Sequence, residues 1–149
     1  MRILALDLGE RRIGVALSDV LGFLATPLTV VQSADRKAAL AAIEHLVYEH
    51  DVRRVIVGYP RSMDGTAGRQ AQLVDRYVEK LRARLRGADG RRKVPVILWD
   101  ERLSTAQAHR LIHEAGNRVQ RDRIDAAAAA VILQSYLDAQ SDSPQGGTT

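Results

Sequence analysis

Acidic residues at three separated points of the chain could together carry out chemistry. Asp7 stands inside the apolar run "ILALDL", and the pair Asp100–Glu101 follows the apolar run "VPVILW". Asp125 opens the alanine-rich stretch "RIDAAAAAVIL". Strands are poor in aspartate because a short carboxylate packs badly and tolerates burial only with partners. These acids are therefore candidates for a shared functional site.

Carboxylates that gather in one pocket repel one another, and they stay ionised only with cations between them. Oxygen ligands without histidine or cysteine suit Mg²⁺ or Mn²⁺. Two such ions, roughly 3.5–4 Å apart, activate water and stabilise the leaving oxygen in phosphodiester hydrolysis. This chemistry requires that the fold bring the acids together, which the sequence alone does not show.

Each acid also has an ordinary structural interpretation. An isolated aspartate such as Asp7 at the end of a strand is usually a turn former or a salt-bridge partner. Asp125 alone could lie in the first turn of a helix, where the helix dipole favours negative charge. Strand alternation sends Asp100 and Glu101 to opposite faces, so only one of them need point at a site. The combination of acids, not any single one, favours function.

The elements that must position these acids follow from the apolar periodicity. The pattern predicts strands at residues 2–8, 12–18, 24–31, 53–59 and 94–100. It predicts helices within residues 33–51, along the apolar stripe from Val74 to Leu85, between Ser104 and Gly116, and from about Asp122 to Asp138. An antiparallel meander of three strands, followed by right-handed crossovers, gives an α/β fold: one five-stranded mixed sheet with helices on both faces.

That topology places two of the acidic points at the same edge of the sheet. Asp7 and the Asp100–Glu101 pair lie at the carboxyl ends of their strands, where open α/β sheets form their sites. The helical face of Asp125 continues through Ala128, Ala129 and Ile132. Small alanines allow that helix to approach the sheet closely, so Asp125 could point at the strand ends.

Composition narrows the class of protein. The chain has 149 residues, is 46% hydrophobic and contains no cysteine, which excludes disulfides and thiolate metal sites and fits a reducing cytoplasm. It shows no signal-peptide pattern and no apolar run near the roughly 20 residues that span a bilayer. Net charge is +4, with 19 arginines and 3 lysines. This excess suits contact with phosphate, although a GC-rich genome produces the same bias.

Four stretches together resemble the RuvX/YqgF family of RNase H-like nucleases. They are "ALDLGERRIGVALSD", "VIVGYP" with "MDGTAG", "WDERLST" and "RIDAAAAAVILQSYL". The resemblance implies an RNase H-like nuclease domain over residues 1–139, and the polar residues 140–149 are predicted to form a disordered tail. It also implies a catalytic site of Asp7, Glu101 and Asp125 that holds Mg²⁺ or Mn²⁺. Asp100 is the next candidate for the place of Glu101, or it has a supporting role.

The resemblance implies a hydrolase that cuts nucleic-acid phosphodiesters. The family is associated with processing the 5′ end of pre-16S rRNA in ribosome biogenesis and with resolving Holliday junctions, and the residues do not distinguish the two. The implied partners are nucleic acid (pre-16S rRNA or branched DNA) and the ribosome, with no membrane. A junction resolvase needs two coordinated cuts and hence a homodimer, whereas an RNA-trimming enzyme can act as a monomer.

Four arginines are candidate substrate-binding residues. Arg12 follows the Asp7 turn, and Arg102 adjoins the acidic pair. Arg61 and Arg69 flank the glycine-containing loop "PRSMDGTAGR", whose backbone N–H groups could cradle a phosphate. Arg12 could instead face solvent, although its place in a matched block favours function, and Arg102 could instead pair with Asp100; the loop that contains Arg61 and Arg69 also resembles an ordinary loop. With one tryptophan and one phenylalanine in the chain, the sequence favours recognition of backbone and shape over stacking on bases.

Two other functions fit parts of the sequence. A non-catalytic RNA- or ribosome-binding module could keep the same fold, but it would gain nothing from clustering negative charge near phosphates. An actin-like ATPase lobe also opens on a "DLG" hairpin. Such ATPases need two lobes, however, and the chain has length for one and lacks a GK[ST] phosphate-binding motif.

Overall fold

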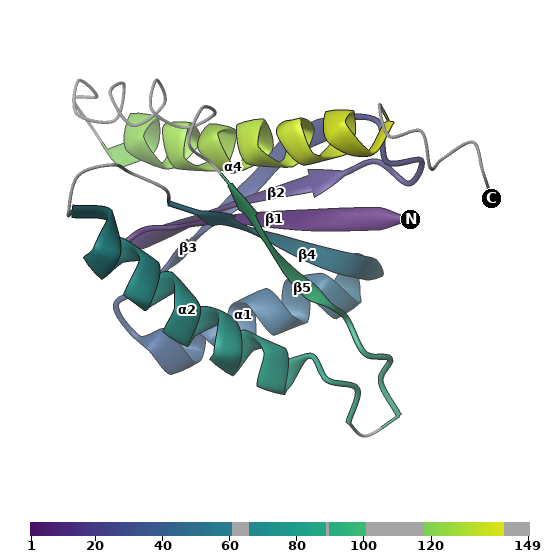
Figure 1. Cartoon of the computed structure of the whole chain (residues 1–149), viewed down its shortest axis with the longest axis horizontal. Coiled ribbons are helices and arrows are strands. Elements are labelled where there is room, and N and C mark those ends of the chain that lie inside the picture. The colour runs from purple at the N-terminus through teal and green to yellow at the C-terminus, as the bar shows by residue number, and fades with distance from the viewer. Residues whose placement is uncertain (61–65, 89, 101–117, 142–149) are drawn as a thin grey trace.

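A single mixed sheet organises the protein (Figure 1). The structure, a computed structural model, describes residues 1–60, 66–88, 90–100 and 118–141. Its strand order is β3-β2-β1-β4-β5. The strands are β1 (Arg2–Leu8), β2 (Arg12–Ser18), β3 (Ala25–Gln32), β4 (Val52–Tyr59) and β5 (Val96–Asp100). The first three pair antiparallel, whereas β4 and β5 pair parallel to β1 and β4, so the predicted mixed sheet is confirmed.

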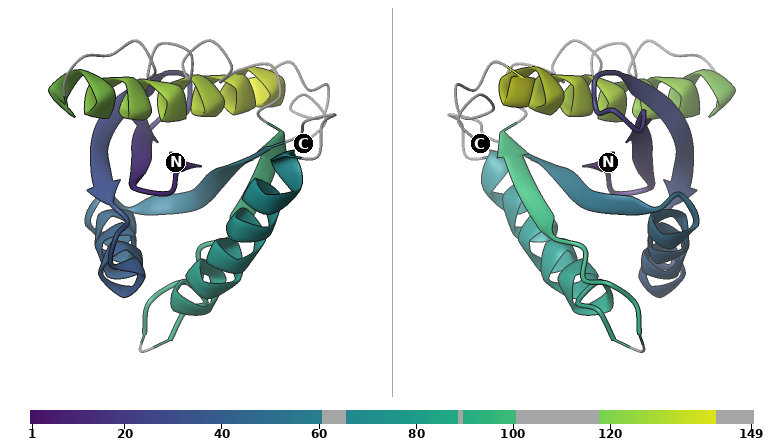
Figure 2. Two further views of the ribbon diagram at one scale, coloured as in Figure 1. Left: turned by 90° about the vertical axis from the view of Figure 1, so that its left-hand side faces the viewer. Right: turned by 90° about the vertical axis from the view of Figure 1, so that its right-hand side faces the viewer.

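Helices cover both faces of the sheet, as predicted. Helices α1 (Arg36–Glu49) and α2 (Thr66–Arg84) lie on one face, and α4 (Arg118–Ser141) crosses the other (Figures 1 and 2). We call these the α1/α2 face and the α4 face. The helix predicted between residues 104 and 116 lies outside the described residues.

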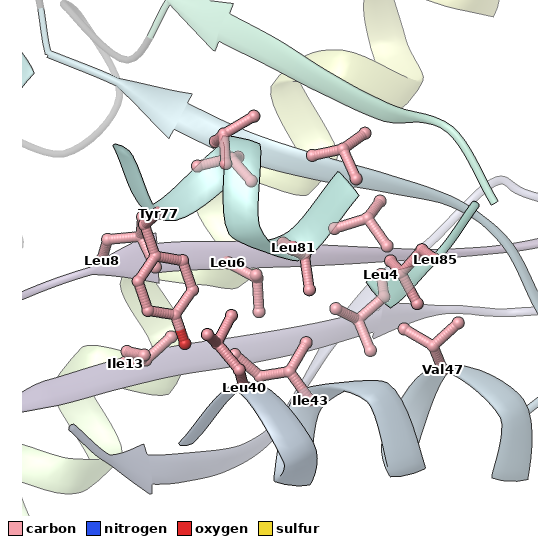
Figure 3. Close-up of a cluster of buried hydrophobic side chains, with 14 of the residues drawn as sticks. Leu4, Leu6, Leu8, Ile13, Leu40, Ile43, Val47, Tyr77, Leu81 and Leu85 are labelled. Carbon is pink, nitrogen blue, oxygen red and sulfur yellow. The ribbon is translucent and has the colours of Figure 1, made fainter. Parts of the chain in front are cut away.

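Alternation along the strands builds two cores, one on each face. On β1, Leu4, Leu6 and Leu8 pack with α1 and α2 in the larger core (Figure 3). Ile3 and Ala5 point the other way and pack with α4. The continuous apolar run of β4 is covered on both faces, since Val55 and Val57 join the first core and Ile56 the second.

Helix α1 begins where the sequence provides a cap. Asp35 accepts a hydrogen bond from the backbone N–H of Ala38 at 3.1 Å and is the N-cap. Below it, Leu40, Ile43 and Val47 are buried, as the helical period predicts.

Helix α4 is longer than its apolar period indicates. It runs from Arg118 to Ser141, four residues earlier and three later than the predicted bounds of about 122 and 138. The added residues are mostly polar, and they form helix without contributing to an apolar stripe. Asp125 therefore lies in the third turn, and an explanation of this acid by the helix dipole does not apply.

No helix within the described ranges combines the length and apolar character needed to cross a bilayer.

Candidate active site

Asp7 lies on the α4 face at the carboxyl end of β1. It follows Ile3 and Ala5 in the alternation of that strand, and its side chain faces the same way. Only 8% of Asp7 is exposed. Its register partner on β2 is Gly14. A buried carboxylate therefore stands beside a position that carries no side chain.

Gly14 is where helix α4 touches the sheet. A Cβ atom built at position 14 would lie 2.0 Å from the carbonyl oxygen of Asp125 and 3.2 Å from the backbone nitrogen of Ala126. Only glycine permits this approach, because both contacts are to backbone. The fully buried Ala128 and Ala129 continue the contact along α4. The close approach predicted from the alanines is confirmed, and it brings Asp125 to the neighbourhood of Asp7.

Arg12, at the start of β2, joins the sheet to α4 by ion pairs. Its Nε donates to Oδ2 of Asp125 at 2.6 Å and lies 3.8 Å from Oδ1 of Asp122. Arg12 shares the face of Gly14 by alternation along β2. Its guanidinium thus lies against acids of α4 that are three residues apart and hence on one face of the helix.

Burial raises the pKa of Asp125, which is 9% exposed. The negative charges of Asp7 and Asp122 raise this pKa further, whereas the hydrogen bond and positive charge of Arg12 lower it. The effect of Asp7 shows that the two carboxylates are near enough to interact electrostatically. The site is a partly compensated pair of buried acids, the kind of arrangement that a cation would stabilise.

The side chain of Asp100 lies on the α1/α2 face of the sheet, opposite to that of Asp7. On β5, Ile97 and Trp99 pack with α4, and the Trp99 Nε1 donates to Oγ of Ser135 at 3.2 Å. Alternation therefore places Asp100 on the α1/α2 face, beside its register partner Tyr59. Asp100 does not share the face of Asp7. Glu101, the next residue, lies outside the described residues.

The predicted arginines are dispersed. Arg12 lies within the acidic site. Arg69 lies near the start of α2 and lines a cavity on the opposite face of the sheet. Arg61 and Arg102 lie outside the described residues.

Sequence reasoning missed three residues that shape the site. Gly14 could have been found, because a glycine inside the apolar strand "RIGVAL" is typical of close backbone approach. At Asp122 the sequence predicts only the start of a helix. Gln70 carried no sequence signal, yet its side-chain amide donates to the carbonyl oxygen of Leu8 at 2.9 Å and ties α2 to the end of β1.

The candidate ligands among the described residues fit a hard divalent cation. Asp7 and Asp125 supply carboxylate oxygens, and their mutual repulsion is what Mg²⁺ or Mn²⁺ would relieve. The part of the chain that the structure describes contains no group of three potential ligands. A third carboxylate would have to come from outside it.

Solved structures share this fold. The RuvC of Thermus thermophilus, in complex with a Holliday junction substrate, superposes with a TM-score of 0.55 over 95% of this chain and 96% of its own, at 16% identity. The fold is thus RNase H-like, in agreement with the predicted class.

Curated relatives match along nearly their whole length. A protein of Thermoanaerobacter pseudethanolicus, provisionally named pre-16S rRNA nuclease, is 42% identical over 94% of this chain and 98% of its own. A protein of Symbiobacterium thermophilum with the same name is 46% identical over 97% and 96%. The family model RuvX, described as Holliday junction resolvase, matches residues 1–139, and the chain belongs to this family.

Proposed function

We propose that the protein is a divalent-metal-dependent nuclease that hydrolyses nucleic-acid phosphodiesters at the Asp7 end of the sheet. The observation that carries the site is the close approach of α4 to the sheet at Gly14, which brings Asp125 to the neighbourhood of Asp7. Burial raises the pKa of Asp125 and the charge of Asp7 raises it further, a perturbation that clusters at functional sites. Membership of the RuvX family supports the reaction class.

Asp7, Asp125 and Glu101 would hold Mg²⁺ or Mn²⁺, which when bound supplies Lewis acidity to the attacking water and the leaving oxygen. The alternation of side chains along β5 favours Glu101 over Asp100 as the third ligand. Asp100 lies on the α1/α2 face. If the alternation of β5 extended by one residue, position 101 would lie on the face of Asp7 and Asp125. The neighbouring Asp100 would then support the strand end.

Arg12 would position Asp125 and contact the substrate. Its Nε is engaged by Asp125, and none of the hydrogen bonds among the described residues uses its two Nη groups. Those groups could donate to a phosphate oxygen, for which a guanidinium is well suited. Arg61, Arg69 and Arg102 stay candidates for further contacts with the phosphate backbone.

We infer pre-16S rRNA as the substrate, trimmed at its 5′ end. Relatives that carry this name match almost end to end at 42–46% identity. Resolution of Holliday junctions is the second candidate, because the family model carries that description. A chain without cysteine fits the cytoplasm, where we place the enzyme.

Cleavage of three labelled substrates tests the proposal: a pre-16S fragment, an unrelated single-stranded RNA and a four-way DNA junction, each with Mg²⁺, Mn²⁺ or chelator. We expect divalent-metal-dependent cutting of the pre-16S fragment. Asp7→Asn should lower the rate by more than about 100-fold, beyond what loss of an outer partner of a metal ligand usually costs. The variant should keep the wild-type circular dichroism and still bind the substrate.

Asp138→Asn is the matched control, since it makes the same change at an exposed position of α4. It should cut like the wild type. If Asp7→Asn cuts as fast as this control, the catalytic assignment is wrong. Binding without cutting by the wild type would favour the RNA- or ribosome-binding module, and symmetric cutting of the junction by a dimer would favour the resolvase.

A further inference from the structure

A cavity of about 450 Å³ lies on the α1/α2 face, opposite the acidic site. It is bounded by the β1–β2 turn, the start of α1 and the first half of α2. Its volume is within the range of small-molecule sites, about 300–1,000 Å³. Leu8, Gly9 and Glu10 form one of its walls, and these residues directly follow Asp7. The cavity and the acidic site thus share one edge of the sheet, on its two faces.

The inner wall of the cavity is apolar. Leu8 and Ile13 come from the sheet, and Leu73 and Tyr77 come from α2 (Figure 3 shows all but Leu73). The ring of Tyr77 extends from α2 toward Ile13, and only 6% of the residue is exposed. These groups form a surface suited to a flat, weakly polar ring.

The rim of the cavity is cationic. Arg36 of α1 and Arg69 and Arg76 of α2 line it, against the single carboxylate of Glu10. All three arginines are exposed, and none forms an ion pair with a carboxylate of the described residues. Three arginines from two helices along one rim supply donors that suit a phosphate.

The hydroxyl of Tyr77 lies behind this wall, so only the apolar part of the side chain faces the cavity. The hydroxyl of Tyr77 is buried and has no hydrogen-bond partner among the described residues. Burial raises the pKa of Tyr77 to about 12, while the positive charge of Arg36 acts in the opposite direction. The hydroxyl therefore stays a donor at neutral pH, and an unpaired buried donor is costly.

We propose that this cavity binds one nucleoside monophosphate unit, with its phosphate at the arginine rim and its base on the apolar wall. The unit could belong to a nucleic-acid strand that crosses the sheet edge from Asp7, or it could be a free nucleotide. The strand form of this proposal rests on the proposed nuclease function, and the free form does not. Neither Arg36 nor Arg76 belongs to the acidic site.

Binding measurements in the cleavage-silent Asp7→Asn background test the proposal. The probes are a short single-stranded RNA, adenosine monophosphate, uridine monophosphate and inorganic phosphate, each titrated by calorimetry. The test variant carries Arg36→Glu and Arg76→Glu. The control variant carries Arg86→Glu and Lys93→Glu, which makes the same change of charge at exposed positions beyond the other end of α2. Thermal melts establish that both variants are folded.

We expect the test variant to bind the mononucleotides at least about tenfold more weakly than the control variant, because two charge-assisted contacts are reversed. If the test variant loses the same factor of affinity for the RNA, and free nucleotides compete with the RNA, the bound unit belongs to a nucleic-acid strand. A loss for the nucleotides alone identifies a free nucleotide. Equal affinity of the two variants for every probe overturns the proposal, as does binding of inorganic phosphate as tight as that of the nucleotides.

These outcomes are separable from failure of the nuclease assignment. If Asp7→Asn still cleaves RNA, the acidic site is wrongly assigned, while the binding of mononucleotides still reports on the cavity. If Asp7→Asn abolishes cleavage but the two variants bind alike, the nuclease stands and the cavity proposal fails.

Discussion

Gly14 of β2 lies against the backbone of Asp125 on α4, so closely that a Cβ atom at position 14 would come within 2.0 Å of the Asp125 carbonyl oxygen. Gly14 is also the register partner of Asp7 on β1. One position without a side chain therefore sets the distance between helix and sheet and the proximity of the two acids.

Gly14→Ala should destabilise the fold and separate the acids. The added methyl meets backbone atoms that cannot rotate away, so we expect a cost near the upper end of the about 1–3 kcal/mol typical of overpacking. For a domain of this size, about 3 kcal/mol corresponds to a fall in Tm of roughly 6–12 °C. Differential scanning calorimetry measures this, and cleavage should fall more than the folded fraction does.

Gly68→Ala is the matched control. Gly68 lies in α2, and a Cβ atom there would meet nothing within 4 Å. Alanine is the better helix former by roughly 0.5–1 kcal/mol, so this variant should melt at or slightly above the wild-type temperature. Equal destabilisation by both substitutions would contradict the assigned role of Gly14.

Arg12→Ala should shift the pH profile of cleavage. Arg12 lowers the pKa of Asp125 by its hydrogen bond and its charge, so its removal lets that pKa rise. Ionised Asp125 is the form that would hold the cation, and the acidic limb of the rate profile should therefore move to higher pH. Rates at saturating metal from pH 5 to 9 measure the shift. A uniform loss at every pH would indicate a role in substrate contact alone.

Asp125→Asn should change how the stability of the metal-free protein depends on pH. Because the pKa of Asp125 is raised in the folded state above its ordinary value of 3.8, the folded protein binds more protons than the unfolded chain between the two values. This carboxyl thus lowers the free energy of unfolding progressively as pH rises through that window. The asparagine variant should gain stability over the wild type as pH rises.

Urea unfolding at a series of pH values, in the presence of chelator, measures that difference. Added Mg²⁺ should stabilise the wild type more than the variant, because binding to the folded state raises its stability. A difference between the two proteins that is constant with pH would show that burial does not perturb Asp125 as inferred.

Glu101→Gln should lower the rate of cleavage much more than Asp100→Asn does. Strand parity places Asp100 with Tyr59 on the α1/α2 face, away from Asp7. We therefore expect Glu101→Gln to lose cleavage by more than about 100-fold, as Asp7→Asn does. Asp100→Asn should lose about tenfold or less. Single-turnover rates with saturating metal compare the two, and the reverse order would make Asp100 the ligand.

Much of the fold was predictable because its signals are local. The apolar runs around Leu6, Val15 and Ile56 predict buried strands whatever covers them, and the period of Leu40, Ile43 and Val47 predicts a helix from neighbouring residues alone. The ends of α4 were not predictable in this way, since most of the residues before Asp122 are polar and show no apolar period.

In the site, too, the features that depend on neighbouring residues were predictable, and those that depend on long-range packing were not. The sequence by itself determined that Asp7 ends an apolar strand and that Asp125 shares a helical face with small alanines, because alternation and helical period are properties of neighbouring residues. Only the tertiary structure decided that α4 crosses at Gly14, that Arg12 pairs with Asp125, and that Asp100 lies on the α1/α2 face. These relations depend on which helix covers which face, and long-range packing sets that choice.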